Sequence, residues 1–337
     1  GVMNRFNYIP AAVIAMAGLA SAANAEVSYW DFNVFSRSTI GSASKTYGSD
    51  FQGASGAVGN AYFNGFAAKT NANSSASLAY GFYGGGDFRL GGSVNNGGVN
   101  VAGTVTMNGA QITGPVTGGG NLGGSGGSIN GNVSISGSKT TGNQLTVNGS
   151  LNTGQAYSAA LDLAGVSSYF QNAGSFAAGM TPTGSYTNQW GELIINAGNP
   201  LNVINVSASD FTNAWGIRVV GTGAVIVNVA GSSLDFASKT WNYQNGASSV
   251  STLLNMNEAS TINMSGGHNV NILAANAATN FSSGQVTGNL IVGSLMGSGQ
   301  VNWNDLGGFS GGALIPAPAG AFILAGAGLI AFRRRRG

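Results

Sequence analysis

The chain has 337 residues, of which 7% are charged, 43% are hydrophobic, 57 are glycine and none is cysteine. Glycine follows no three-residue period, which excludes collagen, and a chain without disulfides must gain its stability from repeated hydrogen bonding and core stacking. Seven of the 12 basic residues lie between positions 26 and 312, together with all ten acidic residues. The body therefore has no basic face for nucleic acid, and we expect no nucleic-acid partner.

Residues 1–25 have the pattern of a secretory signal peptide. Arg5 supplies the positive n-region, residues 9–19 have the composition of the apolar h-region, and Ala23 and Ala25 flank Asn24 as an A-x-A cleavage site. The mature chain is therefore expected to start at Glu26.

The body begins with an aromatic-rich segment, residues 26–88, which we expect to form strands that cap the rest. Between residues 90 and 151, apolar residues alternate in runs of about three to five, separated by Asn-Gly or Gly-Gly pairs. Strands that short can share a continuous core when they stack as rungs of a β-solenoid, and Asn and Gly suit its corners. The Gly/Ser-rich stretch 118–127 could instead be a linker.

One helix is predicted inside the body, over residues 155–171, where apolar residues share one face and could pack along the flank of the solenoid. Alternation typical of strands returns after Trp190. The expected strands are 192–196, 202–207, 217–229, 234–236, 253–256, 261–264, 270–274 and 290–292. No composition shift divides residues 26–308, which we interpret as one elongated unit followed by a spacer, residues 309–318.

The C-terminus combines a proline pair, an apolar helix and a basic end. Pro316, Ala317 and Pro318 precede the apolar run 319–332. The basic end of the segment 319–337 consists of Arg333, Arg334, Arg335 and Arg336. The run after Pro318 is shorter than the ~20 residues of a full membrane span, so a transient membrane tether is favoured over a permanent one, although an ordinary C-terminal anchor is the alternative.

This tail resembles the PEP-CTERM class of exosortase substrates, with Pro-Ala-Pro in place of the usual Pro-Glu-Pro. The resemblance implies an exosortase-like sorting protease as a partner. It also implies a Gram-negative bacterium that makes exopolysaccharide.

Several segments of the body resemble the choice-of-anchor A domain family, in consistent order. They are residues 32–35, 202–210, 225–231, 271–277 and 284–295. The resemblance implies an adhesive surface domain without catalytic residues or a cofactor. The closing rungs are also similar to the β-solenoid of bacterial ice-binding proteins, which carry a flanking helix.

Residues able to carry catalysis are scarce. His268 is the only histidine and follows Ser265-Gly266-Gly267, which predicts an exposed turn residue. A zinc site would need more His or Cys, and the acidic residues are scattered, which gives no support to a glycosidase pair. We therefore predict no catalytic residue, metal site or cofactor.

Aromatic side chains offer a better candidate site. Trp190, Trp215 and Trp241 could stack on sugar rings, or they could seal the ends and the helix seam of the solenoid. Thr104-Val105-Thr106 is a Thr-x-Thr strand of the kind that orders water, but ice binding needs such rows on adjacent rungs. Ser134-Ile135-Ser136 and Thr146-Val147-Asn148 are only loose analogues.

The sequence thus predicts an all-β, elongated solenoid with one flanking helix, a signal helix and a C-terminal transmembrane-type helix. The function that it favours is an exported, non-enzymatic adhesin-like protein of the cell surface or biofilm matrix. Such a protein would bind exopolysaccharide or cell surfaces through many weak contacts. An ice-binding or purely structural surface protein is the alternative, and a polysaccharide-active enzyme is a weaker one.

Overall fold

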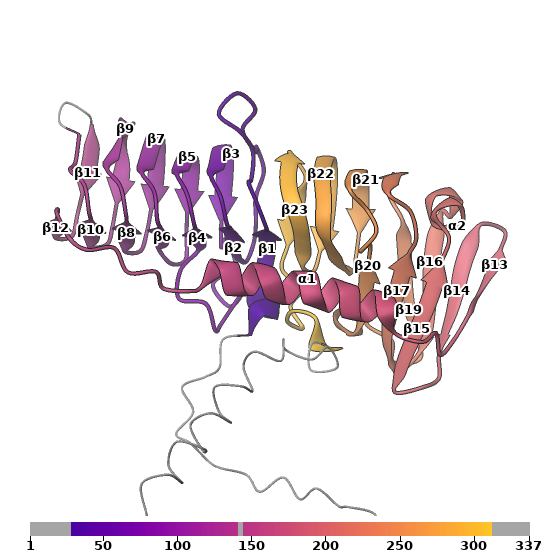
Figure 1. Ribbon diagram of the computed structural model, residues 1–337. Helices are drawn as coiled ribbons and strands as arrows, with labels where there is room; N and C mark the ends of the chain where they lie inside the picture. The colour runs from indigo at the N-terminus through magenta and orange to yellow at the C-terminus, as the bar shows by residue number, and fades with distance from the viewer. Residues whose placement is uncertain (1–27, 141–143, 312–337) are drawn as a thin grey trace, which may run out of the picture.

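The protein is a rod of stacked parallel strands with one long helix lying along its side (Figure 1). The computed structural model describes residues 28–140 and 144–311. The predictions of a signal peptide, of cleavage at Ala23 and Ala25, and of the C-terminal sorting segment fall outside these residues. Within them the chain is mostly β, as the alternating pattern predicted, and no helix is both long and apolar enough to cross a membrane.

Three sheets form the walls of the rod. The long sheet has the strands β12 (Leu151–Asn152), β10 (Val133–Ile135), β8 (Val116–Gly118), β6 (Val99–Val101), β4 (Phe82–Gly84), β2 (Ala54–Ala57), β1 (Phe32–Ser36), β23 (Leu290–Gly297), β22 (Asn271–Thr287), β20 (Thr252–Asn255), β17 (Ala224–Val229) and β15 (Leu201–Val206), with β18 (Ser233–Phe236), β21 (Thr261–His268) and β24 (Gln300–Asn302) attached. The second sheet has β11 (Leu145–Val147), β9 (Leu122–Ile129), β7 (Val105–Ile112), β5 (Phe88–Val94) and β3 (Ala61–Ala68). The third has β13 (Tyr186–Gln189), β14 (Glu192–Ala197), β16 (Gly216–Gly221) and β19 (Thr240–Gln244).

The N-terminal lobe, residues 32–152, repeats every 17 residues over its regular part. Phe82, Val99, Val116 and Val133 are register partners on successive rungs, and all four are buried. Each rung thus adds one residue to the same apolar column, which is how strands of three residues share a continuous core. The Gly/Ser-rich stretch that could have been a linker contributes β9 to this lobe.

The first strand lies in the middle of the rod and not at an end. β1 pairs in parallel with β2 on one side and with β23 on the other. The chain winds away from β1 to β12, returns along the flank as α1 (Leu163–Gly179), and then forms the C-terminal lobe, residues 186–303, which winds back to β1 (Figure 1). The expectation that the entry segment caps the rod is therefore wrong, because its strands find partners on both sides.

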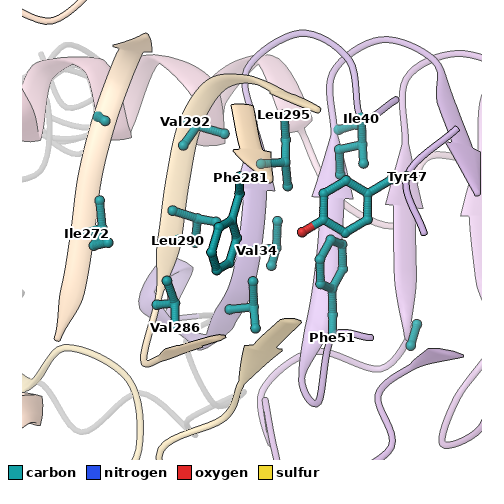
Figure 2. Packing of buried hydrophobic residues seen from close by; sticks show 14 of the residues in the cluster. Val34, Ile40, Tyr47, Phe51, Ile272, Phe281, Val286, Leu290, Val292 and Leu295 are labelled. Atoms are coloured by element: carbon teal, nitrogen blue, oxygen red, sulfur yellow. The ribbon is translucent and has the colours of Figure 1, made fainter. Parts of the chain in front are cut away.

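Large side chains fill the seam between the two lobes. Val34 on β1 lies between Leu290 of the last rungs and the aromatic pair Tyr47 and Phe51 (Figure 2). The Tyr47 and Phe51 rings are 5.1 Å apart, and both side chains are fully buried. The seam therefore continues the core of both lobes without a break.

The flanking helix α1 begins eight residues later than the predicted start at residue 155. Asp162 caps it, since its carboxylate accepts a hydrogen bond from the Gly165 backbone N–H at 3.0 Å. Residues 155–162 form an exposed extended segment, the strap, in place of the predicted first turns of the helix. The buried Asn100 holds the strap, because the Asn100 side chain accepts hydrogen bonds from the Tyr157 hydroxyl and from the Ala160 N–H. The helix then buries Val166, Phe170, Ala173, Gly174 and Ala177 against the long sheet.

Arg37, which directly follows β1, connects the helix to the seam through hydrogen bonds. Its guanidinium donates to the side chains of Ser167 and Gln171 on α1, and to the Ala275 carbonyl and the Asn276 side chain on β22. One residue therefore connects the first rung, a last rung and the helix.

The remaining helical elements are short. They are α2 (Ala208–Asn213) and the 3-10 turns at Tyr29–Asp31 and Ser249–Ser251.

Candidate functional site: an aromatic tip on the C-terminal lobe

The most exposed large apolar side chain in the described residues lies at the far end of the C-terminal lobe. Trp190 is 89% exposed and occupies the turn between β13 and β14. Trp215, which is 54% exposed, sits between α2 and β16. Because β14 and β16 are parallel neighbours, with Glu192 paired to Gly216, the two indoles lie at the same edge of the third sheet.

The turn that carries Trp190 is a two-residue hairpin. Gln189 pairs with Glu192, and Trp190 and Gly191 between them both have left-handed backbone angles, with φ of +52° and +82°. Such hairpins favour Asn-Gly, because both central residues need positive φ. Asn188 supports the turn by accepting a hydrogen bond from the Gly191 N–H at 3.0 Å.

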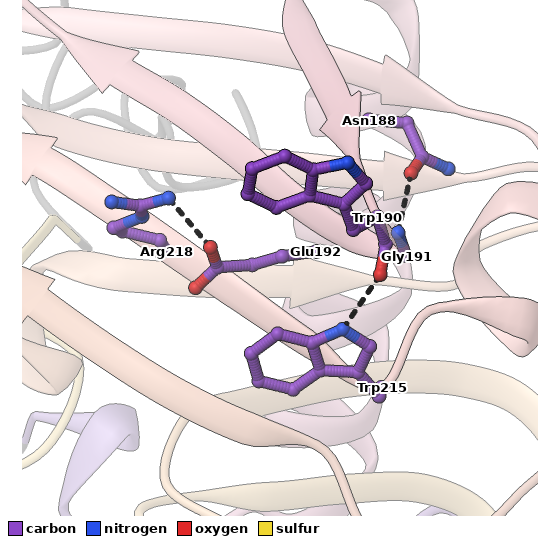
Figure 3. A network of polar contacts seen from close by, with 6 residues as sticks. All are labelled: Asn188, Trp190, Gly191, Glu192, Trp215 and Arg218. Atoms are coloured by element: carbon purple, nitrogen blue, oxygen red, sulfur yellow. Dashed lines mark hydrogen bonds and ion pairs between the residues drawn. The ribbon is translucent and has the colours of Figure 1, made fainter.

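Trp215 is attached to this turn through its indole nitrogen. Its Nε1–H donates to the Trp190 carbonyl at 2.9 Å (Figure 3). A Cβ added at Gly191 would lie 3.0 Å from Trp215 Cδ1, so any larger residue would push the indole away from the turn. The bond uses the one polar atom of the Trp215 ring and leaves its carbon surface free.

A charged pair belongs to the same site, with Glu192 between the two indoles and Arg218 next to Glu192. Arg218 on β16 contacts Glu192 on β14 at 2.6 Å, with side chains that are 28% and 13% exposed respectively. In Figure 3 the two indoles extend in the same direction on either side of the Glu192 side chain. Trp190, Trp215, Glu192 and Arg218, with Asn188 behind the turn, are called the aromatic tip below.

The third tryptophan of the prediction is not part of the aromatic tip. Trp241 is the register partner of Ile217, whose side chain is buried, so it points to the core side of the sheet. It is half-buried and stacks near Tyr243 at a centroid distance of 6.2 Å. Trp30 and Trp303 are buried as well, which matches the alternative that tryptophans seal the seams.

The threonine and serine triplets do not form one array. Thr106 lies between Arg89 and Gly123 on its neighbouring rungs. Ser134 is on β10 of the long sheet, whereas Thr146 on β11 is the partner of Ser128. The three triplets therefore occupy three different rows, and no Thr-x-Thr row repeats beside Thr106.

His268 differs from its prediction as an exposed turn residue. It is the last residue of β21 and only 3% exposed, with its ring edge-on to Phe236 at 5.3 Å. Burial lowers the pKa of His268 to about 4. Its Nε2 is 3.0 Å from the Ser265 carbonyl, so the turn before it folds back onto the ring.

Glu192 and Arg218 escaped the sequence analysis because a single alternating strand does not reveal which residue lies beside it. The usable signal was Trp190-Gly191 between two alternating runs, which marks a two-residue hairpin. Among residues 28–140 and 144–311, no three His, Cys, Asp or Glu side chains gather as a metal site would require. The sorting residues Pro316, Ala317, Pro318 and Arg333 to Arg336 lie outside the described part.

A protein-family model described as "Putative Ice-binding-like adhesive domain" matches residues 112–303, more than half of the chain. The match includes the outer part of the N-terminal lobe, α1 and the whole C-terminal lobe with the aromatic tip. No curated protein and no solved structure matches the chain.

Proposed function

The chain belongs to the family of ice-binding-like adhesive domains, and from this premise we propose that it is an extracellular surface or matrix adhesin that binds polysaccharide. The observation that carries the proposal is the aromatic tip: two exposed indoles held at one end of a rigid rod. Exposed tryptophans with a polar rim are typical of recognition surfaces.

Avidity in this proposal comes from many rods and not from many sites on one rod. The aromatic tip occurs once in the described part of the chain, whereas the outer rows of the rungs carry mixed residues, such as Arg89, Thr106 and Gly123. Weak single contacts become strong when many copies share one surface and one polymer. A dense array on a cell or in a matrix would supply such copies.

We also propose the sorting route that the tail resembles, with export, an exosortase-like protease as a partner and a transient membrane tether. The choice-of-anchor A resemblance supports the same localisation at a cell surface, and the PEP-CTERM resemblance of the tail implies that the cell is Gram-negative. The first and last described residues lie close together beside β1, in the middle of the rod, because the rings of Trp30 and Phe309 are 5.0 Å apart. This placement supports a tether attached at the middle of the rod. A rod held there would present both of its ends sideways.

A catalytic role is not part of the proposal. The acidic pair that a glycosidase uses has a defined separation, and the charged pair at the aromatic tip joins Glu192 to Arg218 instead of to a second acid. This arrangement favours binding over hydrolysis.

The direct test is binding of purified residues 26–312 to producing cells and to their isolated extracellular polymer. We expect saturable binding to cells that is lost when the polymer is removed enzymatically or by washing. Absence of binding to both cells and polymer would contradict the proposal.

Ice binding is the second candidate, and the family description favours it. It predicts thermal hysteresis and shaped ice crystals at micromolar protein. The mixed rows around Thr106 argue against it, so we expect freezing-point depression of no more than the colligative amount. Clear hysteresis would make ice the ligand in place of polysaccharide.

A further inference from the structure

We propose that the aromatic tip binds uncharged pyranose residues of a polysaccharide chain, which stack on the faces of Trp190 and Trp215. This inference rests on the adhesin function proposed above and specifies its ligand class and its site. Backbone strain, the orientation of the indoles, the polar rim and the charge around the tip each contribute to it.

The strain at Trp190 is not compensated by packing within the protein. A bulky residue with positive φ is strained, and a side chain that is 89% exposed gains little from burial. Asparagine would satisfy the same turn with little strain. A tryptophan held in this conformation and exposed to solvent therefore indicates a role outside the fold.

Trp215 offers its ring faces and not its polar edge, and the Trp190 ring beside it is almost fully exposed. The Trp215 N–H is already bonded to the Trp190 carbonyl, and the close approach of Gly191 fixes the ring on the turn. The faces of an aromatic ring carry partial negative charge, and the axial C–H bonds of a pyranose carry partial positive charge. The fixed Trp215 ring also loses little conformational entropy on binding.

The rim around the indoles can bond hydroxyl groups. Glu192 accepts and Arg218 donates, and both keep part of their side chains exposed. Sugar hydroxyls both donate and accept, so they match a rim that contains a carboxylate and a guanidinium.

The charge around the aromatic tip selects against acidic polymers. Residues 180–311 contain two basic side chains, Arg218 and Lys239. Arg218 is paired with Glu192, and Lys239 is 5% exposed with its Nζ bonded to the Thr212 and Ala214 carbonyls. No free cation of this lobe is thus available to a uronate or phosphate.

Acidic side chains elsewhere on the same lobe reinforce this selection. Asp210 accepts hydrogen bonds from Tyr186 and Ser207, which lower its pKa and keep it ionised. Asp235 and Glu258 are exposed on the same lobe. Their field repels polyanions at low salt and leaves neutral sugars unaffected.

The test is affinity electrophoresis of residues 26–312 in gels that contain hydroxyethylcellulose or dextran, which are neutral, or alginate, which is acidic. We expect retardation by at least one neutral polymer and none by alginate. Trp190→Ala and Trp215→Ala should each weaken the binding at least tenfold. Leu306→Ala is the matched control, since it removes another exposed apolar side chain, 74% exposed, away from the aromatic tip.

The outcomes separate this inference from the proposed function. If the protein binds its producer's polymer and both tryptophan variants bind equally well, the site is wrong and the adhesin function stands. Retardation by alginate alone would overturn the charge argument. Loss of self-association in the tryptophan variants would make a second copy the occupant, and failure to bind any polymer would remove both proposals.

Discussion

At the scale of single residues, His268 gives the core a defined pH dependence. Its ring is buried beside Phe236, and the Nδ1 atom has no hydrogen-bond partner within the protein. Burial and, to a lesser degree, the charge of Lys239 lower the pKa of His268 to about 4, although the Ser265 carbonyl acts in the opposite direction. The folded protein therefore keeps this histidine neutral where the unfolded chain does not.

The free energy of unfolding should fall between pH 6.5 and pH 4 for this reason. Above pH 6.5 both states are neutral, and below it the unfolded chain takes up a proton that the folded protein excludes. The loss should approach about 3 kcal/mol and level off near pH 4. Urea titrations of wild type and His268→Leu at several pH values separate the contribution of His268 from that of the carboxylates, which both proteins share. If the free energies of unfolding of the two proteins changed in parallel with pH, the effect of histidine burial would be absent.

At the scale of elements, α1 is stabilised by its buried face and not by its intrinsic helix propensity. Phe170 packs edge-on to Trp30 at 5.3 Å and lies 5.5 Å from Phe35. Phe176, on the same helix, is 43% exposed. The two phenylalanines therefore differ in environment while sharing a residue type and an element.

Phe170→Ala should lower the free energy of unfolding by about 3–5 kcal/mol, because it removes a fully buried ring. Phe176→Ala should change it by no more than about 0.5 kcal/mol. Denaturant unfolding measures both, and limited proteolysis should show faster cleavage in the strap before α1 only for Phe170→Ala. Equal effects of the two substitutions would mean that α1 does not seal the long sheet.

The elements were predictable where the pattern was local. Alternation identified most strands of the C-terminal lobe, for example residues 192–196 within β14. The helix was found, but its start was misplaced, because the hydrogen bonds from Tyr157 and Ala160 to Asn100 are contacts over more than 50 residues. Trp241 could not be assigned to the core side until the register with Ile217 was known.

At the scale of the whole molecule, the order of the rungs was not predictable from the sequence. The pattern of β1 fits an end rung and a middle rung equally well, and only its pairing with β23, more than 250 residues away, decides between them. The end of the N-terminal lobe carries Lys139, next to Leu122 on the preceding rung, with its Nζ bonded to the Leu145 carbonyl. A charge at this position terminates the stack and opposes end-to-end pairing of rods.

The central claim is that Trp190 serves binding at a cost in stability, and one variant measures both. Trp190→Asn introduces the residue that the turn favours, so we predict that the free energy of unfolding rises by about 1 kcal/mol. In the same preparation, binding to the neutral polymer should fall at least tenfold. Unchanged polymer binding by this variant would contradict the account, because the strained indole would then serve neither the fold nor a ligand.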